Sequence, residues 1–382
     1  MRILMVCPSY PPQDVTCGVG DYTRCLAEEL ASQGEDVVVV TSDRYRGSTE
    51  GHVRIVPTFR RWFWDAAMRL AKLSTSLRAD VIHFQYTPEL YGRGMGMVLA
   101  PLLLRVQARQ TAVVVTFHTL IGGGFRSKLM APYLLATAHH SISANEEVTA
   151  LIHRRLPMLR RRVSEIPIGA NIPVVLVTPG ASKDTLRASL GLPLKGPIMV
   201  HFGLIYPGKG LETLFEALSS IRLVHPGAQL VVVGDTRTEN RGYRDALMGL
   251  AVRLDVTPAI IWTGSLTGEE VSRFLQAADI FVVPYDGGVS IRRGSLMAGL
   301  AHGLPVVSTY PVVPSAYLRD GDNISLVPSR DPRALAERII SLLTQPDDAI
   351  RMGKAAAALA ERFTWPVIAR ETRDLYARLL RR

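Results

Sequence analysis

Residues 198–224 read IMVHFGLIYPGKGLETLFEALSSIRLV, and this stretch contains the unit that repeats along the whole chain. It begins with Ile198–Phe202, an almost continuously apolar run that is typical of a parallel strand buried on both faces. A glycine-rich loop follows, and the apolar residues of Leu211–Val224 then recur with the spacing of an amphipathic helix. A strand, a short loop and a helix in this order form a βα unit, which builds parallel sheets covered by helices.

The same alternation runs through the rest of the chain in two series. In the first half we expect strands at Ile3–Cys7, Val37–Thr41, Val81–Gln85, Val113–His118, Ser141–Ala144 and Val163–Ile166, and helices at Tyr22–Ser32, Trp62–Leu77 and Glu146–Leu156. In the second half we expect further strands at Gln229–Val233, Ile260–Thr263, Ile280–Val283, Val306–Ser308 and Ser325–Val327, and helices at Tyr243–Leu254, Gly268–Ala277, Ser295–Ala301, Pro332–Leu343, Asp347–Glu361 and Val367–Leu380. The sequence therefore predicts an α/β fold of two doubly wound parallel sheets, whose ligands bind beyond the carboxyl ends of the strands.

The pattern breaks between the two series, where prolines and glycines interrupt residues 173–196 and only Lys183–Leu190 has a helical spacing. We therefore expect an N-terminal domain over residues 1–172 and an interdomain connection over 173–196. A second domain is expected over 197–362. Residues 363–382 are expected to form a C-terminal helix that packs back toward the first domain.

The composition limits the class of partner. The chain has 382 residues and a net charge of +10, with 47% hydrophobic and 20% charged residues, as in a globular protein with two cores. An excess of positive charge attracts phosphates, nucleic acid or anionic membrane surfaces. Because there is no basic tail and no regular alternation of aromatic and basic residues, we expect phosphorylated small molecules or a lipid surface as partners, and no nucleic acid.

The apolar segments and the cysteines indicate a cytoplasmic protein. Pro8 ends the apolar start of the chain too early for a signal peptide, and Met95–Leu104 is too short to cross a bilayer. Cys7, Cys17 and Cys25 lack CxxC spacing, which argues against a disulfide framework or a zinc site and favours reduced thiols. A peripheral contact with the cytoplasmic face of a membrane stays open.

Two glycine-rich loops that follow predicted strands are suited to binding an anion. Gly18-Val19-Gly20 precedes a helix, where glycines let backbone amides approach a phosphate or a sugar, although a turn with positive φ explains them equally well. The loop Gly203–Gly210 places Lys209 just before the next helix, and a cation beside free amides suits a diphosphate. The alternative for Lys209 is an ordinary exposed lysine.

A third loop, after the predicted strand Ile280–Val283, carries more charge. Arg292 and Arg293 are adjacent there, and Gly294-Ser295 stands at the start of the next predicted helix. Arginine binds phosphate through paired N–H groups, and a serine caps a helix N-terminus. The alternative is that both arginines are solvated.

Taken in order along almost the whole chain, these segments resemble the family 4 glycosyltransferases. Gly18-Val19-Gly20-Asp21-Tyr22 resembles the family's glycine loop, Lys209-Gly210 its phosphate-binding lysine, and Gly303-Leu304-Pro305-Val306-Val307 a turn of its donor domain. The resemblance implies a GT-B fold, in which two Rossmann-like domains face a cleft. It implies transfer of a sugar, with retention of configuration, from a UDP- or GDP-sugar to a small-molecule, glycan or lipid-linked acceptor. No cofactor is expected, since the nucleotide sugar is a co-substrate. The resemblance also implies no divalent metal, because fixed cations and helix N-termini replace it.

The resemblance also assigns His118 to the active site, where it would hydrogen-bond to the transferred sugar. Acceptors bind mainly to the N-terminal domain in such enzymes. Trp62, Ala66 and Leu70 line one face of the expected helix Trp62–Leu77, which either lies at a membrane interface for a lipid-linked acceptor or packs on the sheet. We favour packing on the sheet.

The chain departs from the family's pattern at three positions. Leu204 stands where the family usually has an arginine, and Ser290 and Ala298 stand where it has two glutamates. Because the missing arginine removes a cation from the donor's phosphates, we expect Arg292 or Arg293 to replace it. The predicted diphosphate site consists of Lys209, Arg292, Arg293, Gly294, Ser295, Gly18 and Gly20, and the predicted nucleotide or sugar contacts are Gly203, Asp286 and Ser265.

The missing glutamates leave two other functions open. The chain could be a non-catalytic GT-B protein that binds nucleotide sugars, or a related GT-B enzyme such as a sugar-nucleotide epimerase or a phosphorylase. Sugar transfer to an acceptor distinguishes the glycosyltransferase from both.

Overall fold

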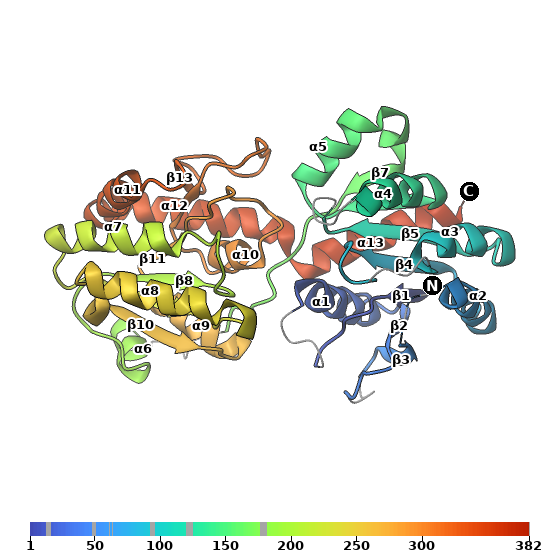
Figure 1. Cartoon of the computed structure of the whole chain (residues 1–382), viewed down its shortest axis with the longest axis horizontal. Coiled ribbons are helices and arrows are strands. Elements are labelled where there is room, and N and C mark those ends of the chain that lie inside the picture. Colours follow the sequence, from blue (N-terminus) through green and yellow to red (C-terminus); the bar gives the residue numbers. More distant parts are fainter. Residues whose placement is uncertain are drawn as a thin grey trace. The chain divides into compact units, whose positions relative to one another are not determined.

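The computed structural model describes residues 1–12, 17–47, 51–60, 62, 64–91, 96–119, 125–175 and 182–381. The chain divides into two compact units, of which the first comprises Met1–Gly169 with Thr364–Arg382 and the second comprises Ala170–Phe363. Each unit contains a parallel sheet with helices on both faces (Figure 1). This confirms the predicted α/β fold of two doubly wound sheets. Among the described residues, no helix is long and apolar enough to cross a membrane.

The sheet of the first unit has the strand order β3-β2-β1-β4-β5-β6-β7. Its direction of winding reverses between β1 and β4, the arrangement whose strand ends bind ligands in open α/β folds. The strands are β1 (Arg2–Val6), β2 (Asp36–Ser42), β3 (Arg54–Phe59), β4 (Val81–Tyr86), β5 (Ala112–Phe117), β6 (His140–Ser143) and β7 (Val163–Glu165).

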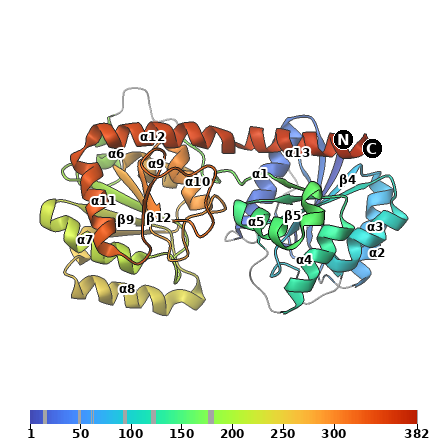
Figure 2. The same cartoon turned by 90° about the horizontal axis from the view of Figure 1, so that it is seen from above.

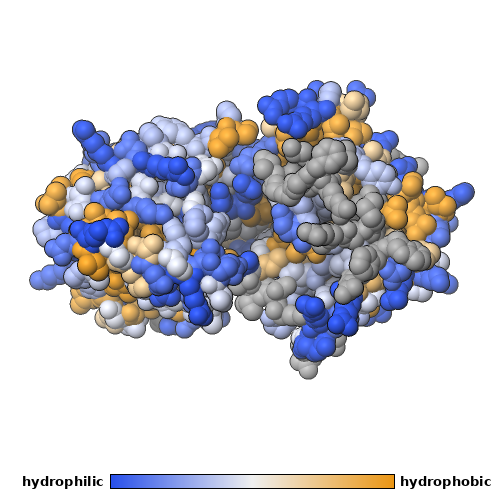
Figure 3. Space-filling model, in the orientation of Figure 1, coloured by the Kyte–Doolittle hydropathy of each residue, from blue (hydrophilic) through white to orange (hydrophobic). Residues whose placement is uncertain are grey.

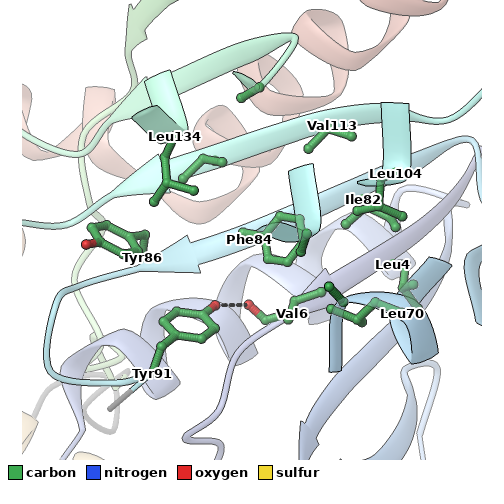
Figure 4. Packing of buried hydrophobic residues seen from close by; sticks show 14 of the residues in the cluster. Leu4, Val6, Leu70, Ile82, Phe84, Tyr86, Tyr91, Leu104, Val113 and Leu134 are labelled. Carbon is green, nitrogen blue, oxygen red and sulfur yellow. Dashed lines mark hydrogen bonds between the residues drawn. The ribbon is translucent and has the colours of Figure 1, made fainter. Parts of the chain in front are cut away.

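Alternate residues of these strands face two hydrophobic clusters. Leu4 and Val6 of β1 join one cluster, and Ile3 and Met5 join the other. Figure 4 shows the first cluster, in which the Tyr91 hydroxyl donates a hydrogen bond of 3.1 Å to the Val6 carbonyl. The helices of the unit are α1 (Gly18–Ser32), α2 (Trp64–Leu77), α3 (Gly96–Gln107), α4 (Phe125–Thr137), α5 (Glu146–Arg155) and α13 (Trp365–Leu380).

The C-terminal helix α13 belongs to the first unit, where it packs beside α1 (Figure 2). Its apolar side chains Ile368, Leu375 and Tyr376 are buried in the same cluster as Ile3 and Met5. The last residues of the chain therefore complete the core of a unit that begins at the N-terminus.

The second unit repeats the winding of the first, with the strand order β10-β9-β8-β11-β12-β13. Its strands are β8 (Ile198–Phe202), β9 (Gln229–Val233), β10 (Ile260–Gly264), β11 (Ile280–Val283), β12 (Val306–Thr309) and β13 (Ser325–Val327). Its helices are α6 (Lys183–Ser189), α7 (Leu211–Val224), α8 (Arg241–Arg253), α9 (Gly268–Ala277), α10 (Gly294–Ala301), α11 (Pro332–Thr344) and α12 (Pro346–Ala360). The winding reverses between β8 and β11. The loops that follow these two neighbouring strands therefore lie side by side at the carboxyl ends of the strands.

Residues 182–196, part of the stretch expected to connect two domains, belong to the second unit. Helix α6 packs against α9, and its Arg187 is only 5% exposed. The Arg187 guanidinium donates to the Asp279 carboxylate at 2.6 Å and to the Ala277 carbonyl at 3.0 Å. An ion pair between buried Arg187 and partly exposed Asp279 thus attaches this segment to the sheet.

Candidate functional site

The candidate site lies in the second unit, after strands β8 and β11. Gly203 follows β8 with φ +136°, a conformation that side chains other than glycine rarely adopt, and a Cβ there would lie 2.9 Å from the Lys209 Nζ atom. Lys209 itself is 5% exposed and precedes Gly210, the N-cap of α7. The loop therefore turns its lysine inward beneath Gly203, and Lys209 is not an ordinary exposed lysine.

The loop after β11 brings a second cation to the same place. The Arg293 guanidinium lies 4.3 Å from the centre of the Tyr285 ring, and its Nη1 atom is 3.5 Å from the Tyr206 hydroxyl. The Lys209 Nζ atom lies 5.2 Å from the centres of both tyrosine rings. Two cations therefore contact the same two tyrosines, and we call Lys209, Arg293, Tyr206 and Tyr285 the cation cluster.

The cation cluster has no counter-ion from the protein: within the described ranges, neither Lys209 nor Arg293 forms an ion pair with a carboxylate. Burial lowers the pKa of Lys209 to about 7, and the charge of Arg293 adds to this effect. Fully buried His201, on β8, has a pKa lowered to about 3 by burial and by Lys209. Because uncompensated buried charge is costly, an arrangement of this kind is suited to receive an anion.

The start of helix α10 adds backbone donors to the cluster. Arg293 is its N-cap, and Gly294 and Ser295 form its first turn, where amide groups point out of the helix without helical partners. The Ser295 hydroxyl lies 2.6 Å from the hydroxyl of fully buried Tyr285. Gly203, Lys209, Arg293, Gly294 and Ser295 are thus brought together as the sequence indicated.

Other predicted residues have different positions. Arg292 is half-buried, and its backbone amide faces the Ser290 hydroxyl at 3.5 Å. Asp286 donates its backbone N–H to the Gly208 carbonyl, but its carboxylate forms an ion pair of 3.1 Å with Arg330. Ser265 is exposed after β10, and the carbonyl of the preceding Gly264 accepts a hydrogen bond of 3.1 Å from the Gly234 amide.

Gly18 and Gly20 belong to the first unit and form the first turn of α1, so the helix begins before the predicted Tyr22. A Cβ on Gly20 would lie 2.9 Å from the Ser9 carbonyl oxygen. Close packing against the backbone of Ser9 therefore explains this glycine.

His118 follows β5 in the first unit and is half-buried. Its Nε2 atom lies 2.9 Å from the Gln85 Oε1 atom, and its ring packs edge-on against Tyr22 with 4.7 Å between ring centres. Burial lowers the pKa of His118 to about 3. The imidazole is therefore neutral at pH 7, where it can make hydrogen bonds but carries no charge.

The predicted apolar face of α2 is part of the core. The helix begins at Trp64 and not at the predicted Trp62, but Trp62, Ala66 and Leu70 are all at most 6% exposed, so the helix packs on the sheet as predicted. A different helix carries exposed apolar side chains: Leu99, Leu102 and Val106 of α3 are 40%, 48% and 59% exposed (Figure 3).

Sequence reasoning missed Tyr206 and Tyr285, the rings that position both cations. Tyr206 lies in the loop of Lys209, and Tyr285 lies in the loop of Arg293. The presence of an aromatic residue beside each predicted anion-binding cation could have indicated both tyrosines. Ser290 and Ala298, where glutamates were expected, are both buried, at 7% and 0% exposure.

Two family models match the chain. The model described as "Glycosyltransferase Family 4" matches residues 16–204, and the model described as "Glycosyl transferases group 1" matches residues 196–345. Together they extend over most of both units.

Proteins of similar sequence are named as glycosyltransferases. The chain is 26% identical to a phosphatidyl-myo-inositol mannosyltransferase of Mycobacterium leprae, covering 98% of this chain and 96% of the relative. It is 28% identical to a D-inositol 3-phosphate glycosyltransferase of Corynebacterium efficiens, covering 62% of this chain and 55% of the relative.

Among solved structures, the Anabaena protein HepE in complex with UDP is similar in fold. Its TM-score is 0.77 at 16% identity, and the alignment covers 99% of this chain and 100% of HepE. At this identity the similarity concerns the fold alone.

Proposed function

Since the chain belongs to glycosyltransferase family 4 and has the GT-B fold, we propose that it transfers a sugar from a UDP- or GDP-sugar, with retention of configuration and without a metal ion. The observation that carries this proposal is the cation cluster at the reversal point of the second sheet. Two cations that have no carboxylate partner among the described residues suit a diphosphate, which is the common group of all such donors. HepE, similar in fold, was solved with UDP, which supports a nucleotide diphosphate as the ligand class.

In the proposed site, Lys209 and Arg293 hold the β-phosphate together with the amides of Gly294 and Ser295. This group leaves with the nucleotide and gains charge as the glycosidic bond breaks. Fixed cations and a helix N-terminus stabilise that charge without reorganising during the reaction. Arg293 thereby replaces the arginine that the family usually has at the position of Leu204.

The acceptor is proposed to bind to the first unit, near His118. The names of the curated relatives suggest an inositol-containing acceptor, either phosphorylated and free or lipid-linked. The exposed apolar side chains of α3, with exposed Arg105 beside them, support a peripheral membrane contact for a lipid-linked acceptor.

The proposal is tested first by binding and then by transfer. A thermal-shift panel of UDP, GDP, ADP and their sugars should identify the base, because a ligand at 100 times its Kd stabilises the protein by about 2.7 kcal/mol. The stabilising donor is then incubated with inositol 3-phosphate and with phosphatidylinositol vesicles, and the products are analysed for a new glycoside.

A second candidate, a non-catalytic protein that binds nucleotide sugars, is favoured by Ser290 and Ala298 in place of glutamates. Nucleotide binding without any hydrolysis or transfer would support it. A failure of every nucleotide to stabilise the chain would contradict both candidates.

The affinity for the nucleotide diphosphate is expected to fall as pH rises above 7. The pKa of Lys209 in the free protein is about 7, and a bound anion raises it because the ammonium form is favoured beside negative charge. Binding therefore takes up a proton near neutral pH, and the affinity decreases by up to about tenfold per pH unit above 7.

This linkage is measured by calorimetric titration of UDP in buffers of different ionisation enthalpy. Lys209→Arg is the matched control, because a guanidinium stays charged at every pH of the experiment. In this variant, any proton taken up on binding comes from titration of the nucleotide's phosphate alone. Equal proton uptake in the two proteins would contradict the role of Lys209.

A further inference from the structure

A chain of buried polar side chains runs through the first unit from α13 to His118. His83, Gln85 and Thr116 point into the interior from β4 and β5, and Tyr376 enters from α13. All four are 0% exposed. Buried polar groups of this kind impose their hydrogen-bond directions on one another, because an unmatched donor or acceptor is costly there.

The two nitrogens of His83 have different roles. Its Nε2 atom lies 2.6 Å from the Thr116 hydroxyl and 3.5 Å from the Gln85 side-chain amide nitrogen. The amide nitrogen can only donate, so Nε2 is the acceptor of the ring. The remaining ring nitrogen, Nδ1, then carries the proton and donates to the Tyr376 hydroxyl oxygen at 2.6 Å.

The same orientation of the Gln85 side chain also sets the tautomer of His118. The Gln85 amide nitrogen faces His83, so its carbonyl oxygen faces His118, with 2.9 Å between the Gln85 Oε1 and His118 Nε2 atoms. A carbonyl oxygen can only accept, and His118 Nε2 must therefore carry a proton. The edge-on contact with Tyr22 holds the plane of the imidazole.

We propose that Gln85 is a positioning residue that keeps His118 in the neutral tautomer protonated on Nε2, so that Nδ1 is left to accept a hydrogen bond from a substrate hydroxyl. Among the described residues, Nδ1 of His118 has no hydrogen-bond partner. His118 would thus accept a hydrogen bond from, and not donate one to, the hydroxyl group that it orients. The role of that hydroxyl as part of a sugar rests on the proposed function, whereas the tautomer does not.

The tautomer is tested directly by ¹⁵N NMR of histidine-labelled full-length protein without substrate. Protonated and unprotonated ring nitrogens have well-separated ¹⁵N shifts, and the signals of His118 are identified by their loss in His118→Asn. We expect Nε2 to be protonated and Nδ1 to be unprotonated at pH 7. Protonation of Nδ1 alone, or of both nitrogens, would overturn the proposal.

Two variants of Gln85 separate positioning from packing. Gln85→Leu removes the acceptor and should give a mixture of tautomers, whereas Gln85→Glu retains an acceptor and should keep the Nε2-protonated form. Gln107→Leu makes the same chemical change on the exposed end of α3 and should leave the His118 signals unchanged. Identical His118 spectra in wild type and a folded Gln85→Leu protein would also overturn the proposal.

A kinetic comparison extends the test to the reaction. Gln85→Leu should lower kcat about tenfold, in the range seen when a group that orients a functional histidine is removed, and should change the KM for the donor little. Gln85→Glu should recover part of kcat. If the wild type transfers no sugar to any acceptor, the proposed function fails, and the NMR result still decides the tautomer.

Discussion

Replacing Arg293 by alanine is expected to weaken the binding of a nucleotide diphosphate by about 1.5–3 kcal/mol, which is about 10- to 150-fold in Kd. The guanidinium lies over the Tyr285 ring and shares two tyrosines with Lys209, so its loss removes one of two cations from the proposed phosphate site. The Kd of UDP or GDP is measured by calorimetric titration of the purified full-length protein.

Arg333→Ala is the matched control for this experiment. Arg333 lies in the same unit, but its side chain is 88% exposed and pairs with Glu337 one helical turn away. The same chemical change there should leave nucleotide affinity within experimental error. An Arg293→Ala protein that is folded and binds the nucleotide as tightly as wild type would refute the phosphate site proposed for the cation cluster.

Replacing Arg187 by methionine is expected to lower the free energy of unfolding of the second unit by about 3 kcal/mol, at the low end for a broken buried ion pair. The Arg187 side chain is 7% exposed, and its removal deprives Asp279 of a hydrogen bond of 2.6 Å. Asp279 is 29% exposed and keeps Lys183 and the Ile198 amide as partners, which limits the loss.

This contribution also depends on pH. Burial raises the pKa of Asp279, but the Ile198 amide together with Lys183 and Arg187 outweighs burial and holds the pKa below its ordinary value. A carboxylate with a lowered folded-state pKa stabilises the protein above its unfolded pKa, and this stability is lost as pH falls through the folded-state pKa. The Arg187→Met effect should therefore shrink in acid.

Urea unfolding is combined with hydrogen exchange of β8, because two units need not unfold together. Arg351→Met is the control: its ion pair with Asp348 joins side chains that are 55% and 50% exposed, and it should cost at most about 0.5 kcal/mol. Equal unfolding free energies for Arg187→Met and wild type would show that α6 is not held by this ion pair.

Much of the fold could be predicted from the sequence because the strands of both sheets are buried on both faces and form unbroken apolar runs. The predicted bounds of β8, β9, β11 and β13 are those of the structure. Strand β3 was missed, because it pairs only with β2, contains Pro57 and is partly exposed. No bounds were predicted for helices α3 and α4, because each contains a proline, at positions 101 and 132, that interrupts a helical pattern.

The site was partly predictable for a topological reason. Lys209 and Arg293 follow neighbouring strands, so the order of the sheet alone brings their loops together. The sequence could not indicate that Arg293 contacts Tyr206 and Tyr285, since the direction of a loop side chain depends on the groups that pack against it. The chain of polar contacts behind His118 was equally hidden, because it joins Tyr376 to His83 across 293 positions of sequence.

The place of α13 has a consequence for biosynthesis. The N-terminal residues of a polypeptide leave the ribosome first, and domains usually fold as soon as all their residues have emerged. The unit that starts at Met1 must wait for Ile368, Leu375 and Tyr376 before one face of its sheet is covered. During translation the second unit can therefore fold before the first, whose apolar cluster stays incomplete until α13 has been synthesised.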